Sequence, residues 1–561
     1  MKKASILLCL IFLVCGGMFI GQKLWATPDT YSMLRAFNKI LKELQDSYVT
    51  PVSADSLIRG AIDGMIDMVH DPHTDFLTRE EYSALRESTT GEFGGIGATI
   101  GRRDERIMVI SPLEGTPAYR SGLQPGDEIL NVDGAPTEGK SVDVVVKEIR
   151  GDPGTEVILT IHRSLIDEPF DVEITRAIIK LDAVPYFGMI DDKIGYVYLR
   201  NFSISADVEL KEALDSLFAM GAEKLVFDLR LNSGGLLNEG LTVSELFLSR
   251  GKEIVATKGR NERERMFRSQ KTYSYVDFPM ITLVDGGSAS ASEIVAGALQ
   301  DWDRSLIVGT TTFGKGSVQN IIPFEDSTAL KLTTARWYTP SGRSIDKPVD
   351  WDGLDGRVTS AQQRLVDRLR SELEELREQA ETDAEIGIVE KIEDDLYDIE
   401  DNIYRLRVDS TKLAEQKEFT TLGPLKRKVY GEGGITPDIV IEPQRLSRLE
   451  TEILTKGLTF DFVVKYTAEH NDITDNFEVE DKLLKEFAVY LLEHEIEFTQ
   501  KEYADVKDRL RSRLKQEFYA NLWGMKEGYR IRVADDSLVQ QAVKMLKEVS
   551  SSQDLFRYAG E

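Results

Sequence analysis

A regular alternation of apolar strands and amphipathic helices between residues 180 and 344 restricts the fold more than any other feature of the sequence. Strand-like runs such as "IGYVYLRNF", "KLVFDLRLN" and "MITLVDGG" are followed by helical patterns at 205–220, 237–248 and 290–302. Strands and helices that alternate in this way bury their apolar faces against each other. The pattern therefore predicts an α/β layered domain.

Residues 91–178 differ, with short apolar runs separated by Gly, Pro and Asp and one helix at 141–149, which predicts a β-rich module. The run "PLEGTPAYRSGLQPGDEILNVDGAP" resembles a PDZ domain, with "EFGGIGA" as its carboxylate-binding loop. Successive N–H groups at Gly95, Ile96 and Gly97 can bind a terminal carboxylate, and the next strand offers an edge to a peptide. Phe93 and Ile96 are the expected groove contacts. A plain glycine-rich hairpin is the alternative.

Helical patterns flank and interrupt these two modules. Apolar residues spaced by threes and fours at 358–409 predict a coiled-coil-like insertion, and "GGITPDIVIE" (433–442) predicts a strand that returns to the α/β core. The predicted divisions are a signal or anchor (1–26), an N-terminal helical region (27–90), the PDZ-like module (91–178), the core (179–350 plus 428–444), the insertion (351–427) and a C-terminal helical region (445–561).

The N-terminus has the layout of an export signal. Lys2 and Lys3 precede an uncharged apolar run from Ala4 to about Gly21. The run is about long enough to span a bilayer, and the cleavage candidate at Ala26 has bulky Leu24 at the small-residue position. A removed signal peptide and an uncleaved anchor therefore both stay open. Either way we expect an exported protein, periplasmic or anchored in the inner membrane and facing the periplasm.

Charge and cysteine content exclude several classes of function. The 561 residues carry a formal net charge of −27, which would repel nucleic acid. Both cysteines, Cys9 and Cys15, lie in the N-terminal segment. The remainder therefore has no thiol for a disulfide, a thiolate metal site or cysteine catalysis.

The segment "DGGSASASEIVAGALQD" (285–301) places Ser288, Ser290 and Ser292 at the start of a predicted helix. Ser290 and Glu293 have the spacing of a capping box, so helix capping accounts for one hydroxyl without any catalysis. The alternative is a nucleophile. A helix that directly follows an apolar strand presents its first residues in a cleft, beside N–H groups that can stabilise an oxyanion.

A nucleophilic serine needs a base, and lysine is the remaining candidate because the five histidines lie before or within the β-rich module or in the C-terminal helical region. Lys315 in "TFGKGSVQ" follows the strand "SLIVG", which would lie beside the strand that leads to Ser290. Burial there would lower the pKa of the amine toward the working pH. A surface lysine in a glycine loop is the alternative.

Two other motifs carry no chemistry in this interpretation. "GTTTFGK" (309–315) has the spacing of a phosphate-binding loop, but Gly316 replaces the required Ser or Thr and a strand follows where a helix is needed. "VHDPHTDFL" holds His70 and His73 on a Pro-containing turn, which we interpret as structural. No spaced ligand cluster is present, so we expect neither a metal nor another cofactor.

Together, "GGSASASEIVAGALQD" and "GTTTFGKGSVQ" resemble the catalytic core of the carboxyl-terminal processing peptidases, or tail-specific proteases. The resemblance implies that Ser290 is the nucleophile, that Lys315 is its base and that Gln319 holds the lysine in position. It also implies that the PDZ domain gates this dyad. The likeness covers roughly residues 35–345 and 433–442.

The same resemblance extends to "DLRLNSGG" (228–235), which matches the family's glycine turn. It implies an oxyanion hole formed by the N–H groups of Gly235 and Ala291, although the sequence does not decide between Gly234 and Gly235. Ser233 departs from the pattern, because Pro or Gly is common there, and should alter the turn only mildly.

These observations predict an α+β multidomain protein with a PDZ module and a crotonase/ClpP-like layered protease core. The expected activity is that of an exported serine endopeptidase, which binds the C-termini of protein or peptide substrates and cleaves through an acyl-enzyme. Membrane contact and self-association stay open. A catalytically silent scaffold is the main alternative, and a crotonase-like acyl-handling enzyme is a second one.

Overall fold

The computed structural model describes residues 28–103, 106–164, 166, 168–260, 263–346, 417–470 and 472–560. The predicted export signal or anchor (1–26) and the coiled-coil pattern (358–409) lie outside the described residues. Within these ranges, no helix is long and apolar enough to cross a membrane. The same ranges hold no group of three His, Cys, Asp or Glu side chains that could bind a metal ion.

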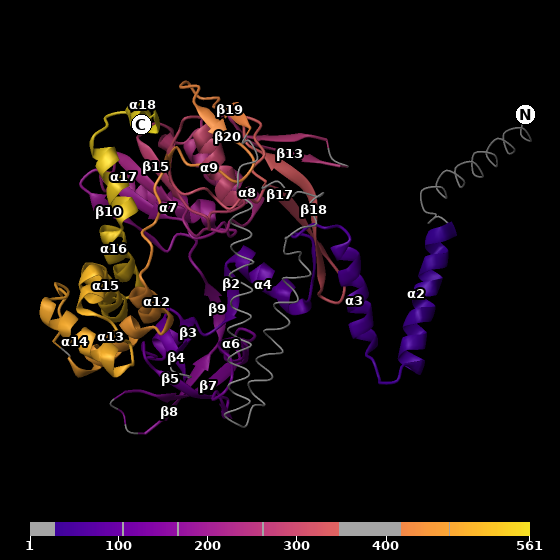
Figure 1. Ribbon diagram of the computed structural model, residues 1–561, viewed down its shortest axis with the longest axis horizontal. Helices are drawn as coiled ribbons and strands as arrows, with labels where there is room; N and C mark the ends of the chain where they lie inside the picture. Colours follow the sequence, from indigo (N-terminus) through magenta and orange to yellow (C-terminus); the bar gives the residue numbers. More distant parts are fainter. Residues whose placement is uncertain are drawn as a thin grey trace, which may run out of the picture.

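A six-stranded sheet forms the centre of the α/β core (Figure 1). Its first two strands are antiparallel and the others pair in parallel. The strands are, in order, β10 (Tyr186–Asp191), β11 (Ile194–Tyr198), β12 (Lys224–Asp228), β15 (Met280–Val284), β16 (Leu306–Gly309) and β21 (Ile439–Val440). Every residue of β11 and β15 is buried, as expected for a parallel sheet covered on both faces. The predicted return strand is confirmed as β21.

Helices from two distant parts of the chain cover this sheet. The helices α7 (Ala206–Ala219), α8 (Leu237–Phe247) and α9 (Ala291–Asp301) pack on one face. The other face is covered by α16 (Met525–Asp535), α17 (Ser537–Lys547), α18 (Ser552–Leu555) and the turn η2 (Phe556–Gly560). The last part of the C-terminal region is therefore a layer of the core itself, which the sequence patterns did not indicate.

A second sheet carries the loop that contains Lys315. β1 and β13 pair with one side of β18, at its two ends, β14 follows β13, and β17 pairs along the other side of β18. The strands of this sheet are β1 (Asp75–Leu77), β13 (Glu253–Gly259), β14 (Arg265–Arg268), β17 (Ser317–Pro323) and β18 (Ala329–Tyr338). The small elements β19 (Glu418–Thr420), β20 (Lys428–Tyr430) and η1 (Ser274–Val276) complete the core.

The PDZ-like module is a separate antiparallel sheet with its own apolar core. Its strands are β3 (Ala98–Arg103), β4 (Arg106–Pro112), β5 (Glu128–Val132), β6 (Ala135–Pro136), β7 (Glu156–His162) and β8 (Phe170–Thr175), with helices α5 (Pro117–Arg120) and α6 (Val142–Ile149). In the described chain, β3 ends the sheet and pairs only with β4, and α6 packs beside it. A ribbon of β2 (Glu92–Gly95) and β9 (Ala177–Lys180) joins the module to the core.

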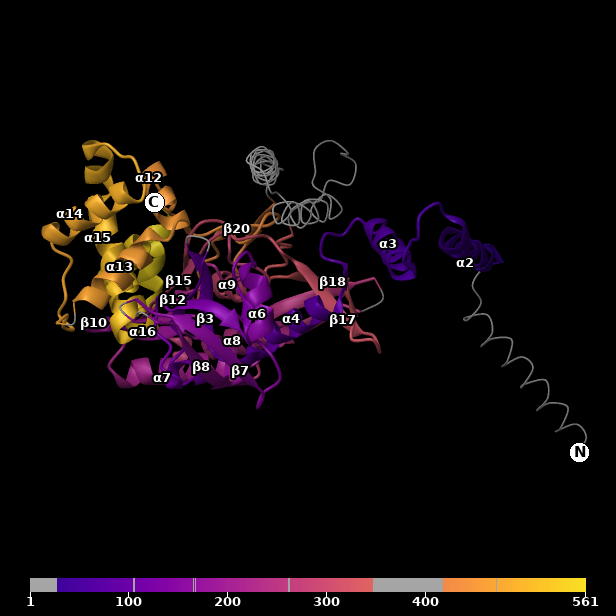
Figure 2. The same ribbon diagram turned by 90° about the horizontal axis from the view of Figure 1, so that it is seen from below.

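The N-terminal helices α2 (Pro28–Ser47) and α3 (Ala54–Asp67) extend away from the rest of the molecule (Figure 1 and Figure 2). They carry exposed apolar side chains, among them Met33 and Met65. The short helix α4 (Arg79–Thr90) then leads into the PDZ module, and its capping box at Thr78 and Glu81 fixes where it begins.

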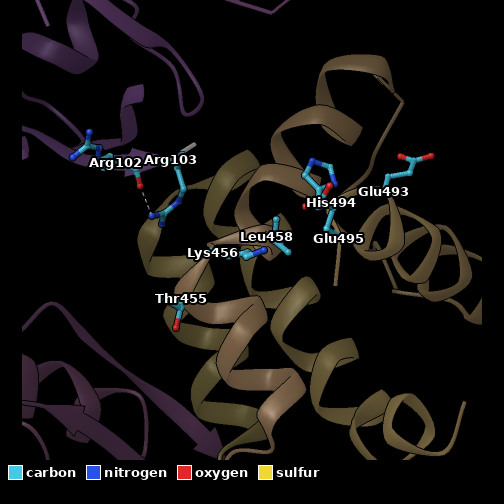
Figure 3. A pocket seen from close by; sticks show the side chains of 8 residues that line it. All are labelled: Arg102, Arg103, Thr455, Lys456, Leu458, Glu493, His494 and Glu495. Atoms are coloured by element: carbon cyan, nitrogen blue, oxygen red, sulfur yellow. Dashed lines mark hydrogen bonds between the residues drawn. The ribbon is translucent and has the colours of Figure 1, made fainter. Parts of the chain in front are cut away.

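Four helices of the C-terminal region pack on the PDZ module. They are α12 (Arg448–Thr455), α13 (Leu458–Glu469), α14 (Asp481–Glu493) and α15 (Gln500–Trp523), and they share a core of their own. Arg103 on β3 lies over the ring of Phe460 at 5.8 Å. A cavity of about 490 Å³ lies beside this contact. Figure 3 shows the side chains that line it, among them Arg103 from β3 and Lys456, Leu458 and His494 from the helical region. No predicted site residue lines it.

Because α17 covers the second face of the central sheet, its apolar residues should contribute to stability as core residues do. Leu546 is fully buried against that face. In the full chain we expect Leu546→Ala to lower the free energy of unfolding by about 2 to 5 kcal/mol. Leu492 on α14 is 57% exposed, so Leu492→Ala should change it by less than about 0.5 kcal/mol. Denaturant titrations that give equal losses for both variants would contradict this packing.

Candidate active site

Ser290 occupies a strained backbone position between β15 and α9. Its φ of 53° and ψ of −112° are unfavourable for a residue with a side chain, at a cost of about 1 to 3 kcal/mol. The Ser290 N–H donates to Glu293 Oε2 at 2.8 Å. The Ser290 N–H and the Glu293 carboxylate thus form the predicted capping-box pair, and the same carboxylate fixes the backbone of Ser290.

The two neighbouring serines have structural roles. Ser288 Oγ donates to the carbonyl oxygen of Leu229 at 2.8 Å, and Ser292 Oγ donates to that of Asn232 at 2.7 Å. The Ala289 N–H also donates to Asn232, at 3.0 Å. These bonds fasten the segment that carries Ser290 to the glycine turn that follows β12.

The glycine turn places free N–H groups beside Ser290. The Gly234 N–H donates to Asn232 Oδ1 at 2.9 Å, whereas in the described chain the N–H groups of Gly235 and Ala291 donate to no residue. Gly234 has a φ of 95°, and a Cβ atom there would lie 2.9 Å from both Ala291 N and Ser290 Cβ. The structure thus favours Gly235 over Gly234 as the donor that pairs with Ala291.

A buried carboxylate joins the segment of Ser290 to the loop of Lys315. Glu293 is completely buried. Besides the Ser290 N–H, it accepts the Lys315 N–H at 3.0 Å, the Gly314 N–H at 2.7 Å and the Thr312 hydroxyl at 2.6 Å. Burial raises its pKa to about 6, against the lowering effect of these hydrogen bonds. The sequence offered only its capping-box spacing as a signal for this residue.

Lys315 lies half-buried in the loop between β16 and β17. The strand before this loop, β16, pairs with β15, as predicted. Burial lowers the pKa of its amine, the positive charge of Lys331 lowers it further, and the carboxylates of Glu293 and Asp71 oppose the shift. No hydrogen bond joins Lys315 Nζ to Ser290 Oγ in the described structure. The structure therefore brings the two backbones together through Glu293 without joining the two side chains.

Gln319 does not contact the lysine amine. Its Nε2 donates to Ser317 Oγ at 2.7 Å, two residues away on the same face of β17. The position predicted from the resemblance, with the amide holding the lysine, is not adopted in this structure.

The turn that contains His73 lies beside the lysine, which the sequence analysis missed. Asp71 accepts the Thr74 hydroxyl at 2.6 Å and the His73 N–H at 3.1 Å. Thr74 Oγ1 in turn accepts the Thr333 N–H of β18 at 3.1 Å. Burial first, and then the charge of Lys315, lower the pKa of His73. The turn is structural, as predicted, but it also faces the site.

The glycine loop of the PDZ module has free donors, although one predicted contact is wrong. In the described chain the N–H groups of Ile96 and Gly97 donate to no residue, which fits a carboxylate-binding nest. The Ile96 side chain is only 3% exposed and belongs to the PDZ core, so it cannot line a groove. Phe93 lies on β2 with Arg150 over its ring at 4.6 Å, and Gly95 pairs with Ala177 of β9.

Comparison with known families assigns most of the chain. The profile described as "Peptidase family S41" matches residues 193–353, and "PDZ domain" matches 108–163. The profile "Activating protease CtpB N-terminal domain" matches 19–81, and "Probable PDZ-protease, C-terminal helical domain" matches 449–504. The PDZ match indicates that the chain binds peptides.

The matches to carboxy-terminal processing proteases cover most of the length of these relatives. A carboxy-terminal-processing protease of Bartonella bacilliformis is 41% identical over 351 residues, which are 61% of this chain and 80% of the relative. Carboxy-terminal processing protease CtpA of Bacillus subtilis is 35% identical over 337 residues, 60% of this chain and 71% of the relative. Among solved structures, the photosystem II D1 C-terminal processing protease is 27% identical, covers 57% of this chain and 91% of its own, and has a TM-score of 0.35.

The layered core, the PDZ domain and these relatives define a serine-type peptidase with a PDZ domain. The chain belongs to the carboxyl-terminal processing peptidases, within peptidase family S41.

Because Gly234 touches the segment of Ser290, a side chain there should disturb the site more than the fold. A Cβ at Gly234 would lie 2.6 Å from the Ala289 carbonyl oxygen. We expect Gly234→Ala to lower kcat by about 100-fold or more, as loss of an oxyanion donor does. Gly221 has a similar φ of 98° but nothing within 4 Å of the added atom, so Gly221→Ala is the matched control and should stay active. Equal activity of both variants in a peptidase assay would refute this role of the turn.

Glu293 should act as a positioning residue for both reacting side chains. Glu293→Gln keeps the shape of the side chain but replaces one of its two acceptor oxygens by an NH2 donor, which would face backbone N–H groups. We expect kcat to fall by about 100-fold, as misplacement of reacting groups does, with KM little changed. Steady-state kinetics should show no such loss for Glu223→Gln, whose side chain is 58% exposed. An equal rise in KM with kcat intact would show that Glu293 serves substrate binding instead.

Proposed function

We propose that this protein is an exported serine endopeptidase that binds substrate C-termini in its PDZ groove and cleaves with Ser290 and Lys315. Ser290 is the nucleophile, Lys315 is the general base, and Gln319 positions the lysine in the active arrangement. The N–H groups of Gly235 and Ala291 form the oxyanion hole. The export signal in residues 1–26 would take the enzyme to the periplasm or leave it anchored in the inner membrane.

The strained Ser290 beside two free N–H groups is the observation that carries this proposal. A residue with a side chain held at a φ of 53° and a ψ of −112° fits a nucleophile better than an ordinary helix start. The N–H groups of Gly235 and Ala291 supply donors where negative charge develops on the substrate carbonyl oxygen. A scaffold without catalysis would need neither the strain nor the donors.

The reaction proceeds in two balanced steps. Neutral Lys315 takes the proton of Ser290 Oγ as the oxygen bonds to the carbonyl carbon, and the oxyanion forms opposite the two N–H groups. Collapse of this intermediate breaks the C–N bond, and the Lys315 ammonium returns its proton to the leaving amine. Water, deprotonated by the same lysine, then attacks the ester, and Ser290 recovers its proton as the acid product leaves.

The separated side chains of Lys315 and Ser290 fit a resting arrangement. A peptide that binds along the open edge of β3, with its carboxylate on the N–H groups of Ile96 and Gly97, would shift the PDZ domain and thereby align the lysine. The parallel sheet with helices on both faces supports a crotonase/ClpP-like core. We propose that residues 358–409, outside the described structure, form the coiled-coil-like insertion.

The decisive experiment incubates the chain from Thr27 onward with an unfolded reporter protein that has an apolar C-terminus. We expect cleavage by the parent and none by Ser290→Ala or Lys315→Ala, while Lys258→Ala, which changes an exposed lysine, stays active. Products are read by mass spectrometry. Amidation of the reporter's C-terminus should weaken cleavage, because it removes the carboxylate. Full activity of Lys315→Ala would show that the base lies elsewhere.

The pH dependence follows from the sign of the lysine shift. A general base must be neutral, so kcat/KM should rise with pH as Lys315 loses its proton. Because burial lowers the pKa of Lys315 below its ordinary value of 10.5, the rise should be centred below pH 10.5. A profile measured between pH 5 and pH 10 that falls throughout its alkaline half would contradict a lysine base.

A further inference from the structure

We propose that the turn Asp71–Thr74 and Lys331 of β18 form an outer wall of the catalytic site, whose charges act on Lys315. This inference rests on the proposed role of Lys315 and extends the site to a segment far earlier in the chain, residues 71–74. Asp71, His73 and Lys331 act here through Lys315, so they are positioning residues and not catalytic ones.

Hydrogen bonds attach the turn to the sheet that carries the lysine loop. Thr74 is buried, and its hydroxyl both donates to Asp71 Oδ2 at 2.6 Å and accepts the Thr333 N–H at 3.1 Å. Thr333 pairs directly with Gln319 of β17. Directly after the turn, β1 pairs with β18, with Asp75 opposite Lys331. The turn is therefore held at a fixed place beside β18, level with the residues that follow Lys315.

Charged groups from several elements face Lys315 at this place. Lys331 comes from β18, Glu293 from α9, and Asp71 and His73 from the turn. Asp346 lies next to the loop as well, since it accepts the Gly316 N–H at 2.6 Å and pairs with Arg336 at 3.2 Å. The lysine thus sits among two carboxylates that favour its ammonium form and a second lysine that opposes it.

The two sides of this wall act in opposite directions on Lys315. The negative charge of Asp71 raises the pKa of the amine, and the positive charge of Lys331 lowers it. The pKa of His73 lies below its ordinary value, so at neutral pH this ring is uncharged and Asp71 dominates the turn. Removing the charge of Asp71 and removing that of Lys331 should therefore shift the pH at which activity begins in opposite directions. Damage to the fold would not produce opposite shifts.

The test compares pH profiles of kcat/KM for two charge-removing variants of the full enzyme. Asp71→Asn should move the rise of activity to lower pH, and Lys331→Gln should move it to higher pH. Lys331→Arg keeps the charge and should keep the parent profile. Asp326→Asn removes a carboxylate from the exposed turn of the same hairpin, and it should also leave the profile unchanged. Shifts of the same sign in both charge-removing variants, or no shift in either, would overturn the proposal.

A second readout separates this inference from the proposed function. In Ser290→Ala protein, amine acylation of Lys315 is followed against pH by mass spectrometry, which needs no catalysis. We expect the labelling onset to move down in Asp71→Asn and up in Lys331→Gln. If labelling shifts as expected but Lys315→Ala still cleaves, the effect of Asp71 and Lys331 on Lys315 is supported and the assignment of Lys315 as the base is wrong. If Lys315→Ala is inactive and neither variant shifts the labelling, the assignment of Lys315 as the base is supported and the proposed effect of Asp71 and Lys331 is rejected.

Discussion

The arrangement of the active site depends on one buried carboxylate. Glu293 lies on the first turn of α9, and it accepts hydrogen bonds from the backbone on either side of the site, at Ser290 and at Lys315. Ser290 and Lys315, the proposed nucleophile and base, come from different loops at the ends of neighbouring parallel strands. Strand pairing alone would not fix the distance between these loops. A buried carboxylate needs hydrogen-bond donors, and the backbone N–H groups of the two loops need an acceptor. The hydrogen bonds between Glu293 and these N–H groups satisfy both.

The strain at Ser290 is balanced locally. The unfavourable backbone dihedrals of Ser290 destabilise the folded state by about 1 to 3 kcal/mol. Each hydrogen bond around this residue stabilises it by about 1 kcal/mol. Ser288, Ser292 and Asn232 supply such bonds, and they join the Ser290 segment to the glycine turn. The same bonds that hold the strain also orient the N–H groups of Gly235 and Ala291. Ser288 and Ser292 therefore hold the turn in which Ser290 takes its strained backbone position.

The parts of this site that the sequence predicts are those with a local pattern. The strand before Ser290, the neighbouring strand before Lys315 and the return strand β21 all follow from short apolar runs. The side-chain contacts do not, because rotamers depend on neighbours from distant segments. Gln319 bonds to Ser317 in place of the lysine, and Ile96 turns into the PDZ core. The turn at His73 reads as a plain Pro-containing turn, since nothing local reveals that it pairs with β18.

The C-terminal helices show how a segment with no motif can still shape the site. Arg230 follows β12 at the start of the glycine turn, and its guanidinium binds Asp228 at 2.6 Å and Asp536 at 2.9 Å. Asp536 also caps α17 through the N–H groups of Leu538 and Val539. Burial on its own lowers the pKa of Arg230, but the two carboxylates outweigh it and raise the pKa above its ordinary value. The layer that covers the second face of the sheet thus also anchors the glycine turn, which holds the proposed oxyanion donor.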